Sequence, residues 1–228
     1  MKTKTKLIIL ITVLSICIVA TVTGVTVAYW MGAEGTNQIA PQTDSTDWNY
    51  YAKYFIYDEV KNDSNATIGY RIIGFKDTVL ENVIIPRYAT GGWLQTTDAN
   101  GNATLTAIDG TNPVAVLIVG NTIFAGDTDK KIPVTLTIPT TVDIETGAFM
   151  GLTNLNKITI KQVNSFGSST PDNYINIGEN AFFGCFNVET FVAPKQVNLI
   201  VNGVTYGEDE FETFKIKTGL IVDGLNRS

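Results

Sequence analysis

Short stretches in which apolar and polar residues alternate recur along most of the chain. The stretch from Val134 to Ile138 (VTLTI) places apolar residues two apart with threonines between them, which is typical of a β-strand with one buried face. Pro139 follows, and because proline lacks the N–H that a strand ladder needs, we expect the strand to end there. No long amphipathic helix is indicated after residue 47. The pattern predicts a mainly β fold.

One phrase of the sequence occurs twice. AFMGLTNLNKI begins at Ala148, and AFFGCFNVETF begins at Ala181. A third, more divergent copy, VGNTIFAGD, begins at Val119. Self-similarity at a short period is the sequence signature of a solenoid. The alternative is a chance similarity between two hairpins of an ordinary β-sandwich.

The residues of each copy predict a local structure. Glu145 to Phe149 is expected to form one helical turn with Phe149 pointing inward, and Gly151 then allows the chain to reverse. Asn154 and Leu155 lead into a second strand, Lys157 to Ile160. A single unit cannot bury its own apolar side, so neighbouring units are expected to stack.

This pattern resembles the BspA-like leucine-rich repeats of bacterial surface proteins. The structural repeat positions that carry the resemblance in this sequence are Ile138, Pro139, Ala148, Phe149, Gly151, Leu155, Ile158, Ile177, Gly178, Ala181, Phe182, Gly184, Cys185, Val188 and Pro194. The fragment ENVIIP, which ends at Pro86, matches only the strand and proline. The segment from Lys161 to Tyr174 departs from the pattern and is an insertion. The resemblance implies a short leucine-rich-repeat solenoid.

The pattern of the first 31 residues predicts that the chain is exported. Three lysines precede an uncharged apolar stretch from Leu7 to about Met31, which is long enough to span a bilayer as a helix. It is either a cleaved signal peptide or an uncleaved anchor in the cytoplasmic membrane. Both alternatives predict an extracellular or cell-surface location for the rest of the chain.

These markers divide the chain into five parts. We expect a signal peptide or membrane anchor over 1–31, a polar linker over 32–47, a β-rich N-terminal region over 48–116, leucine-rich repeats over 117–194 and a β-rich C-terminal cap over 195–228. Asn100-Gly101 and Asn202-Gly203 each lie between β-prone runs and predict hairpins. The run from Lys61 to Thr67 predicts the turn of a third.

Composition limits the chemistry. The chain carries a net charge of −6 and three of its lysines lie in residues 1–31, so the remainder is acidic and is not expected to bind nucleic acid. The sequence contains no histidine, which excludes Ser-His-Asp and Cys-His catalysis and histidine-ligated zinc. Of its two cysteines, Cys17 lies in the apolar segment and Cys185 in a repeat, so no intrachain disulfide and no cofactor is expected.

Two weaker signals involve acidic residues. Asp98, Asn100, Asn102 and Asp109 are spaced like ligands of a calcium loop, but Ala103 stands where such loops need glycine. The hairpin explains the same residues, and we expect no metal site. The acidic run from Glu208 to Glu212 would suit a carboxylate-based hydrolase only if two carboxyl groups faced each other. We interpret it as a solvated loop.

The sequence therefore predicts a bacterial surface protein that is not an enzyme. The resemblance implies adhesion, through a protein or glycan ligand at the cell surface. Contact is expected across the repeat sheet or the insertion, where Phe166 and Tyr174 are candidate binding residues. A structural envelope or matrix protein that self-associates through exposed strand edges is the alternative. A hydrolase is a remote third possibility.

Overall fold

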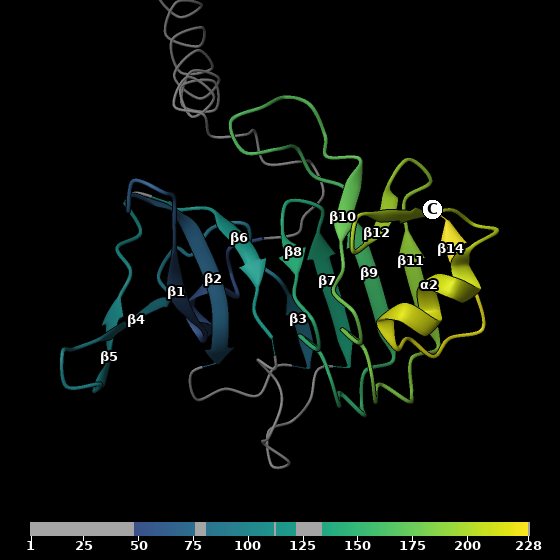
Figure 1. Cartoon of the computed structure of the whole chain (residues 1–228), viewed down its shortest axis with the longest axis horizontal. Helices are drawn as coiled ribbons and strands as arrows, with labels where there is room; N and C mark the ends of the chain where they lie inside the picture. The colour runs from purple at the N-terminus through teal and green to yellow at the C-terminus, as the bar shows by residue number, and fades with distance from the viewer. Residues whose placement is uncertain (1–47, 76–80, 112, 122–133, 228) are drawn as a thin grey trace, which may run out of the picture. The chain divides into compact units, whose positions relative to one another are not determined.

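The computed structural model describes residues 48–75, 81–111, 113–121 and 134–227 (Figure 1). The chain divides into two compact units, and the helices and strands described here belong to the larger one, Thr46–Ser165 with Thr170–Ser228. The expected export segment (1–31), the linker (32–47) and most of the repeat copy that begins at Val119 lie outside the described residues. No helix in the described part of the chain is long and apolar enough to cross a membrane.

Strands dominate the described residues, as the alternating pattern predicts. The N-terminal region contains a short 3-10 helix, η1 (Ala52–Tyr54), and strands β1 (Phe55–Lys61), β2 (Thr67–Phe75), β3 (Asn82–Ile84), β4 (Trp93–Thr97), β5 (Ala103–Ala107) and β6 (Val116–Val119). The repeat region contains β7 (Thr135–Pro139), β8 (Asp143–Ile144), β9 (Lys157–Lys161), β10 (Tyr174–Asn176) and β11 (Thr190–Ala193). The C-terminal region contains β12 (Asn198–Val201), β13 (Val204–Tyr206), α2 (Phe211–Thr218) and β14 (Leu225–Arg227).

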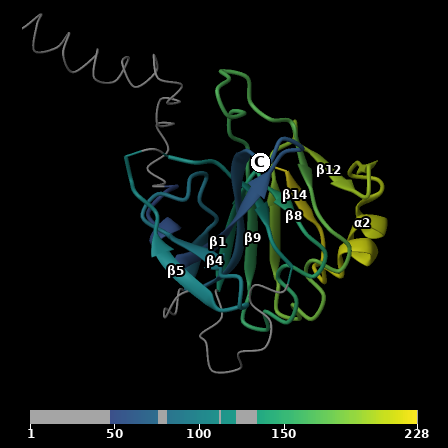
Figure 2. The same cartoon turned by 60° about the vertical axis from the view of Figure 1, so that its left-hand side comes forward.

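The N-terminal region is built from hairpins. β1 pairs antiparallel with β2, and β4 pairs antiparallel with β5, which confirms two of the predicted hairpins. Among the described strands these form one sheet in the order β5-β4-β1-β2-β6-β8, and Figure 2 brings the β4–β5 hairpin to the front. The residues just before β1 do not extend that strand, because Ala52 to Tyr54 form η1 and the strand starts at Phe55.

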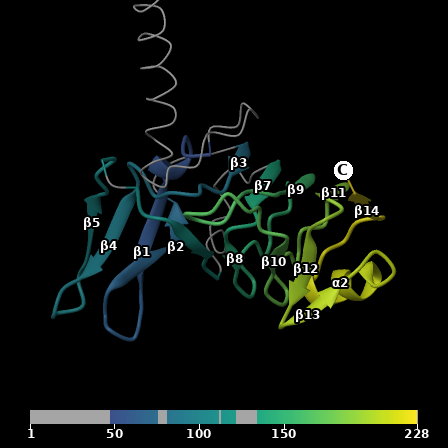
Figure 3. The same cartoon turned by 90° about the horizontal axis from the view of Figure 1, so that it is seen from above.

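The repeat copies stack as successive coils, each of which supplies one strand to each of two facing sides. On one side β3, β7, β9, β11 and β14 run parallel in one sheet, and Figure 3 shows this row opposite β8, β10 and β12. β3 is the strand of the ENVIIP fragment. This fragment, which matches the repeat only in part, is therefore one layer of the stack. The core lies between the two rows and is filled by the inward residues Leu136, Ile138, Ile144, Ile158, Ile160, Ile175, Ile177, Phe191, Leu199 and Val201.

The repeated phrase forms the turns that join the coils. Residues 146–151 are hydrogen-bonded turns rather than the expected helical turn. The amide of Phe149 donates to the carbonyl of Ala181 at 2.8 Å, and the amide of Gly151 donates to the carbonyl of Phe183 at 2.8 Å. Because these amides bond to the next coil, they cannot all close a local helix. Gly151 and Gly184 both have φ near +80°, which only glycine adopts at little cost.

The stacking continues beyond Pro194, where the sequence places the start of the cap. β12 pairs in parallel with β10, and the Asn202-Gly203 hairpin joins it to β13 as predicted. The region is not entirely β, because α2 follows. Phe211, Phe214 and Thr218 recur at helical spacing and are buried, but the segment is too short to reveal a helix by periodicity. The amide of Phe182 donates to the carbonyl of Thr218 at 2.9 Å, so the end of α2 takes the place of a further repeat turn.

The base of the insertion is tied to the coils on which it lies. The amide of Asp172 donates to the carbonyl of Val163 at 2.9 Å and closes the insertion on itself. The amide of Val163 donates to the hydroxyl of Thr140 at 3.1 Å, and Nη2 of Arg87 donates to the carbonyl of Asn164 at 2.8 Å. Val163, Thr140 and Arg87 are all buried. The insertion therefore leaves the solenoid at a fixed point.

Candidate binding surface

The five-stranded sheet presents a regular outward face. Its outward residues alternate with buried ones along each strand and lie in register across strands about 4.8 Å apart. We call this set the outer sheet face. It consists of two rows, Asn82, Thr135, Lys157 and Thr190 in the first and Ile84, Thr137, Thr159, Val192 and Asn226 in the second.

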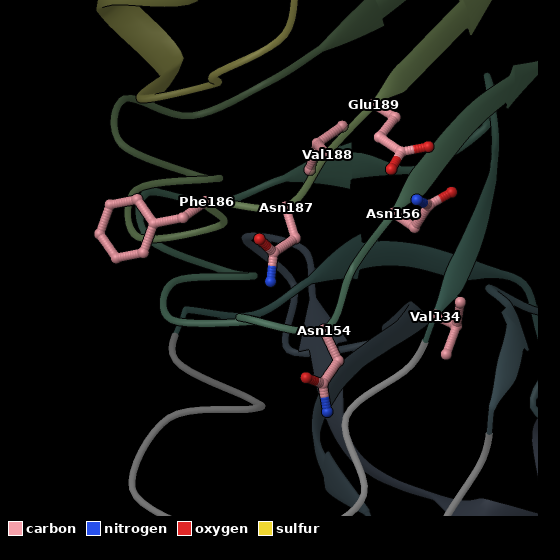
Figure 4. Close-up of a pocket in the computed structure, with 7 residues that line it drawn as sticks. All are labelled: Val134, Asn154, Asn156, Phe186, Asn187, Val188 and Glu189. Atoms are coloured by element: carbon pink, nitrogen blue, oxygen red, sulfur yellow. The ribbon is translucent and has the colours of Figure 1, made fainter.

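An open pocket of about 570 Å³ lies where β7, β9 and β11 begin (Figure 4). We call it the strand-entry pocket. It is lined by Val134, Asn154, Asn156, Phe186, Asn187, Val188 and Glu189. Asn154 and Asn187 are equivalent residues of two repeat copies, and Figure 4 shows their side chains pointing the same way from successive loops. The pocket is therefore a product of coil stacking.

Shared backbone hydrogen bonds fix the pocket residues. The carbonyl of Asn156 accepts bonds from the amides of Glu189 and Thr190, at 2.8 and 3.2 Å. The carbonyl of Val134, one coil earlier, accepts from the amides of Asn156 and Lys157 in the same way. Nδ2 of Asn187 also donates to the carbonyl of Thr153, which joins one loop to the next. The floor of the pocket is therefore held by the same contacts that hold the coils together.

The pocket and the outer sheet face are one continuous surface. Val134, Asn156 and Glu189 line the pocket and directly precede β7, β9 and β11. They are therefore next to the first row of the outer sheet face. Phe186 borders the pocket and is 63% exposed. The surface thus carries amide, hydroxyl, amine and carboxylate groups, and the exposed ring of Phe186 lies at the border of the pocket. Such a surface can donate and accept hydrogen bonds and contact an apolar ring.

The sequence-predicted candidates Phe166 and Tyr174 do not line the pocket. Tyr174 begins β10, in the three-stranded sheet β10-β12-β13, and is 44% exposed. Phe166 lies in a turn of the segment 166–169, which is not part of the larger unit. The pocket residues were missed as binding candidates, although the identity of Asn154 and Asn187 in the repeat was the signal that marks them.

The acidic residues that are spaced like calcium ligands form hydrogen bonds with nearby residues of the chain. Oδ1 of Asp98 accepts the amides of Asn100 and Asn102, and its hydrogen bonds with Asn102 hold the pKa of the Asp98 carboxyl below its usual value. Asp109 lies beyond the far end of β5 and binds Thr111. Within the described residues, no group of three or more acidic or cysteine side chains is placed to hold a metal.

The acidic run near the C-terminus has structural contacts. Oε2 of Glu210 accepts the amide of Gly207 at 3.1 Å, just before α2. Glu212 pairs with Lys215 one turn along the helix at 2.8 Å, and Glu208 lies 4.0 Å from Arg227. These contacts direct the carboxylates to local partners.

Cys185 is a buried packing residue. Its thiol donates to the carbonyl of Phe149 at 3.2 Å, and burial raises the pKa of the thiol to about 11. The thiolate that would act as nucleophile or metal ligand is therefore scarce at neutral pH.

The repeats are also identified by comparison with known proteins. The family model described as a BspA type leucine rich repeat region matches residues 118–223 with six copies. No curated protein matches the chain. Among solved structures, a leucine rich cell surface protein from Faecalibacterium prausnitzii A2-165 is similar, with 17% identity and a TM-score of 0.36. The match covers 75% of this chain and 41% of that one. Residues 118–223 of this chain are therefore identified by the family model as BspA-type leucine-rich repeats.

Proposed function

We propose that this chain is an exported bacterial cell-surface protein that binds a protein or glycan ligand without catalysing a reaction. The observation that carries the proposal is the continuous surface formed by the strand-entry pocket and the outer sheet face. Stacked repeats characteristically present extended binding surfaces of this kind. Export rests on the lysines and apolar stretch of residues 1–31, which fit either a signal peptide or a membrane anchor.

The chemistry of the surface suits a polar ligand. Threonine hydroxyls lie in register on neighbouring strands, and asparagine amides point from successive loops, so donors and acceptors recur at the coil spacing. An extended peptide or a chain of sugar rings also presents polar groups at regular intervals. Phe186 adds an exposed ring against which a sugar or an apolar side chain could stack.

Ligand binding should be measured on the full-length chain, solubilised in a mild detergent and presented to an array of matrix proteins and glycans. Thr159→Arg places a long charged side chain at the centre of the outer sheet face. Thr205→Arg places the same group on β13, outside the proposed surface, and is the matched control. We expect Thr159→Arg to weaken binding at least tenfold and Thr205→Arg to leave it unchanged.

A second pair of variants tests the pocket. Asn154→Trp should fill it, whereas Asn198→Trp adds the same ring at an exposed position at the start of β12. Equal losses from both members of each pair would contradict the proposed surface, and failure of every ligand on the array to bind would contradict the adhesion role.

Export has its own measurement. The mass and N-terminal residue of the chain recovered from cells distinguish a cleaved signal peptide from an intact membrane anchor. Recovery of the intact chain from the cytoplasm alone would overturn the surface location.

A structural role in the envelope or matrix is the second candidate, and the exposed edge strand β5 is the specific observation that favours it. The two functions separate in one experiment, because concentration-dependent assembly without ligand binding supports only the structural role.

A further inference from the structure

β5 is an open edge of the six-stranded sheet. It pairs with β4 on one side, and no described strand pairs with it on the other. All five of its residues are exposed, and Leu105, at its centre, is 41% exposed. Exposed strand edges are sites where another strand can add to a sheet.

The register of the hairpin shows which backbone groups face outward. The amide of Ile108 donates to the carbonyl of Gly92, and the amide of Asp98 donates to the carbonyl of Asn102. Because hydrogen-bonded positions alternate along an antiparallel ladder, the even-numbered residues of β5 bond to β4. The N–H and C=O groups of Ala103, Leu105 and Ala107 therefore point away from the sheet.

The sequence of β5 is a palindrome. Residues 103–107 read ATLTA, with Leu105 at the centre. A second copy that is related by a two-fold axis at this residue would place Leu105 against its own equivalent and Ala103 against Ala107. Each of these outward pairs would exchange two N–H···O bonds. The threonines of the two strands would face each other between these pairs. Such self-complementarity is what a two-fold interface requires.

Residues that usually protect an edge strand are missing from this one. Sheet edges are commonly blocked by lysine, proline or inward-pointing charge. Residues 103–107 contain neither a charge nor a proline. The nearest acid after the strand, Asp109, would face Gly101 of the second copy, so the two-fold arrangement brings no like charges opposite each other there.

We propose that β5 pairs antiparallel with β5 of a second copy of this chain, with Leu105 on the two-fold axis. The contact joins two six-stranded sheets edge to edge. One short strand buries less area than a stable interface needs, so the dimer is weak and forms at high local concentration. Such pairing is independent of ligand binding and gives self-association of this chain a defined geometry.

A charge exchange at the axis tests the contact. Leu105→Lys and Leu105→Glu each place like charges opposite each other in a homodimer, whereas an equimolar mixture places opposite charges there. Sedimentation velocity of the full-length chain in mild detergent, over a concentration series, measures dimerisation. We expect each variant alone to dimerise at least about fivefold more weakly than the unmodified chain, and the mixture to recover. Recovery also shows that both variants fold.

The matched control uses another exposed strand residue. Ile68, on β2, is 51% exposed, and Ile68→Lys and Ile68→Glu should leave dimerisation unchanged. A chain that stays monomeric throughout the series, or lysine and glutamate variants whose mixture fails to recover, would overturn the contact. Ligand binding by a strictly monomeric chain would leave the proposed binding function intact.

Cross-linking gives an independent measurement. Residues in a hydrogen-bonded antiparallel pair have Cα atoms about 5.5 Å apart, within disulfide range. Leu105→Cys in a Cys17→Ser background should therefore form disulfide dimers on mild oxidation, whereas Ile68→Cys should not. Cys185 is buried and does not interfere. Equal cross-linking of both variants would contradict the two-fold pairing.

Discussion

The rings of Phe149 and Phe182 are stacked, with centroids 5.6 Å apart and planes only 6° from parallel. The two residues are 33 positions apart, and the insertion lies between them. Their turns stay in register because amides of one coil bond to carbonyls of the next. Equivalent turns therefore stack in register, although the number of residues that separates them varies along the sequence.

Removing either ring should destabilise the fold strongly. Both side chains are fully buried, so Phe149→Ala and Phe182→Ala are each expected to lower the free energy of unfolding by about 3–5 kcal/mol. Urea unfolding of the two single variants and the double variant measures their coupling. We expect the double variant to lose about 0.5–1.5 kcal/mol less than the sum, because the stacked pair is lost only once. Simple additivity would show that the rings do not stabilise each other.

Gly178 is a point of close contact between coils. A Cβ atom there would lie 2.3 Å from the backbone nitrogen of Thr146, in the preceding coil. Gly178→Ala should therefore force the coils apart and cost about 1–3 kcal/mol in urea unfolding. Gly224→Ala is the control, since nothing lies within 4 Å of its Cβ position. Similar losses for both variants would indicate a general effect of replacing glycine.

Burial of Cys185 predicts a loss of stability at alkaline pH. In the folded chain the pKa of the thiol is raised from 9.0 to about 11, so the unfolded chain releases its proton first as the pH rises. Between about pH 9 and 11 the folded state binds more protons, and stability falls by roughly 2–3 kcal/mol. Urea unfolding at pH 8, 9, 10 and 11 measures this loss.

Cys185→Ala is the control for that measurement. It removes the contribution of the thiol and should flatten the pH dependence from pH 9 to 10. Burial also raises the pKa of Tyr57 well above its usual value of 10, so a loss of the same sign should persist in the variant above pH 10. An unchanged slope at pH 9–10 would show that the thiol is not responsible.

Glu145 joins the N-terminal region to the repeats. Its carboxylate pairs with Arg71 of β2 and also accepts the amide of Asn121 at 2.9 Å. We expect Glu145→Ala to lower the free energy of unfolding by about 1–3 kcal/mol, because a charged acceptor is lost from two donors. Glu145→Gln keeps an acceptor and should cost less. Thermal unfolding at low and high salt checks the ionic part, which should shrink as salt rises.

The alternation of apolar and polar residues and the repeated phrase in the sequence predicted much of this fold. The alternation from Val134 to Ile138 marks β7, and Asn202-Gly203 marks the β12–β13 turn. The match over residues 118–223 confirms the family resemblance. These features depend on residues close together in the chain, whose preferences act independently of the remainder of the fold.

Features that depend on stacking were not visible in the sequence. Asn156 and Glu189 differ chemically, and their closeness follows only from the backbone register of β9 and β11. The end of α2 replaces a repeat turn although it shares little sequence with one, because the amide of Phe182 needs only a carbonyl at Thr218. A backbone hydrogen bond can form with almost any side chain present. A segment that replaces a repeat turn in this way is therefore hard to recognise from its sequence.

The closed base of the insertion has a consequence for how the protein can vary. The bond between Asp172 and Val163 brings the two ends of the segment together, while Thr140 and Arg87 hold that base to neighbouring coils. We therefore expect changes in the residues between them to leave the path of either flanking strand unaltered. The insertion is therefore the place on this scaffold where we expect a foreign epitope to be grafted with least effect on the fold.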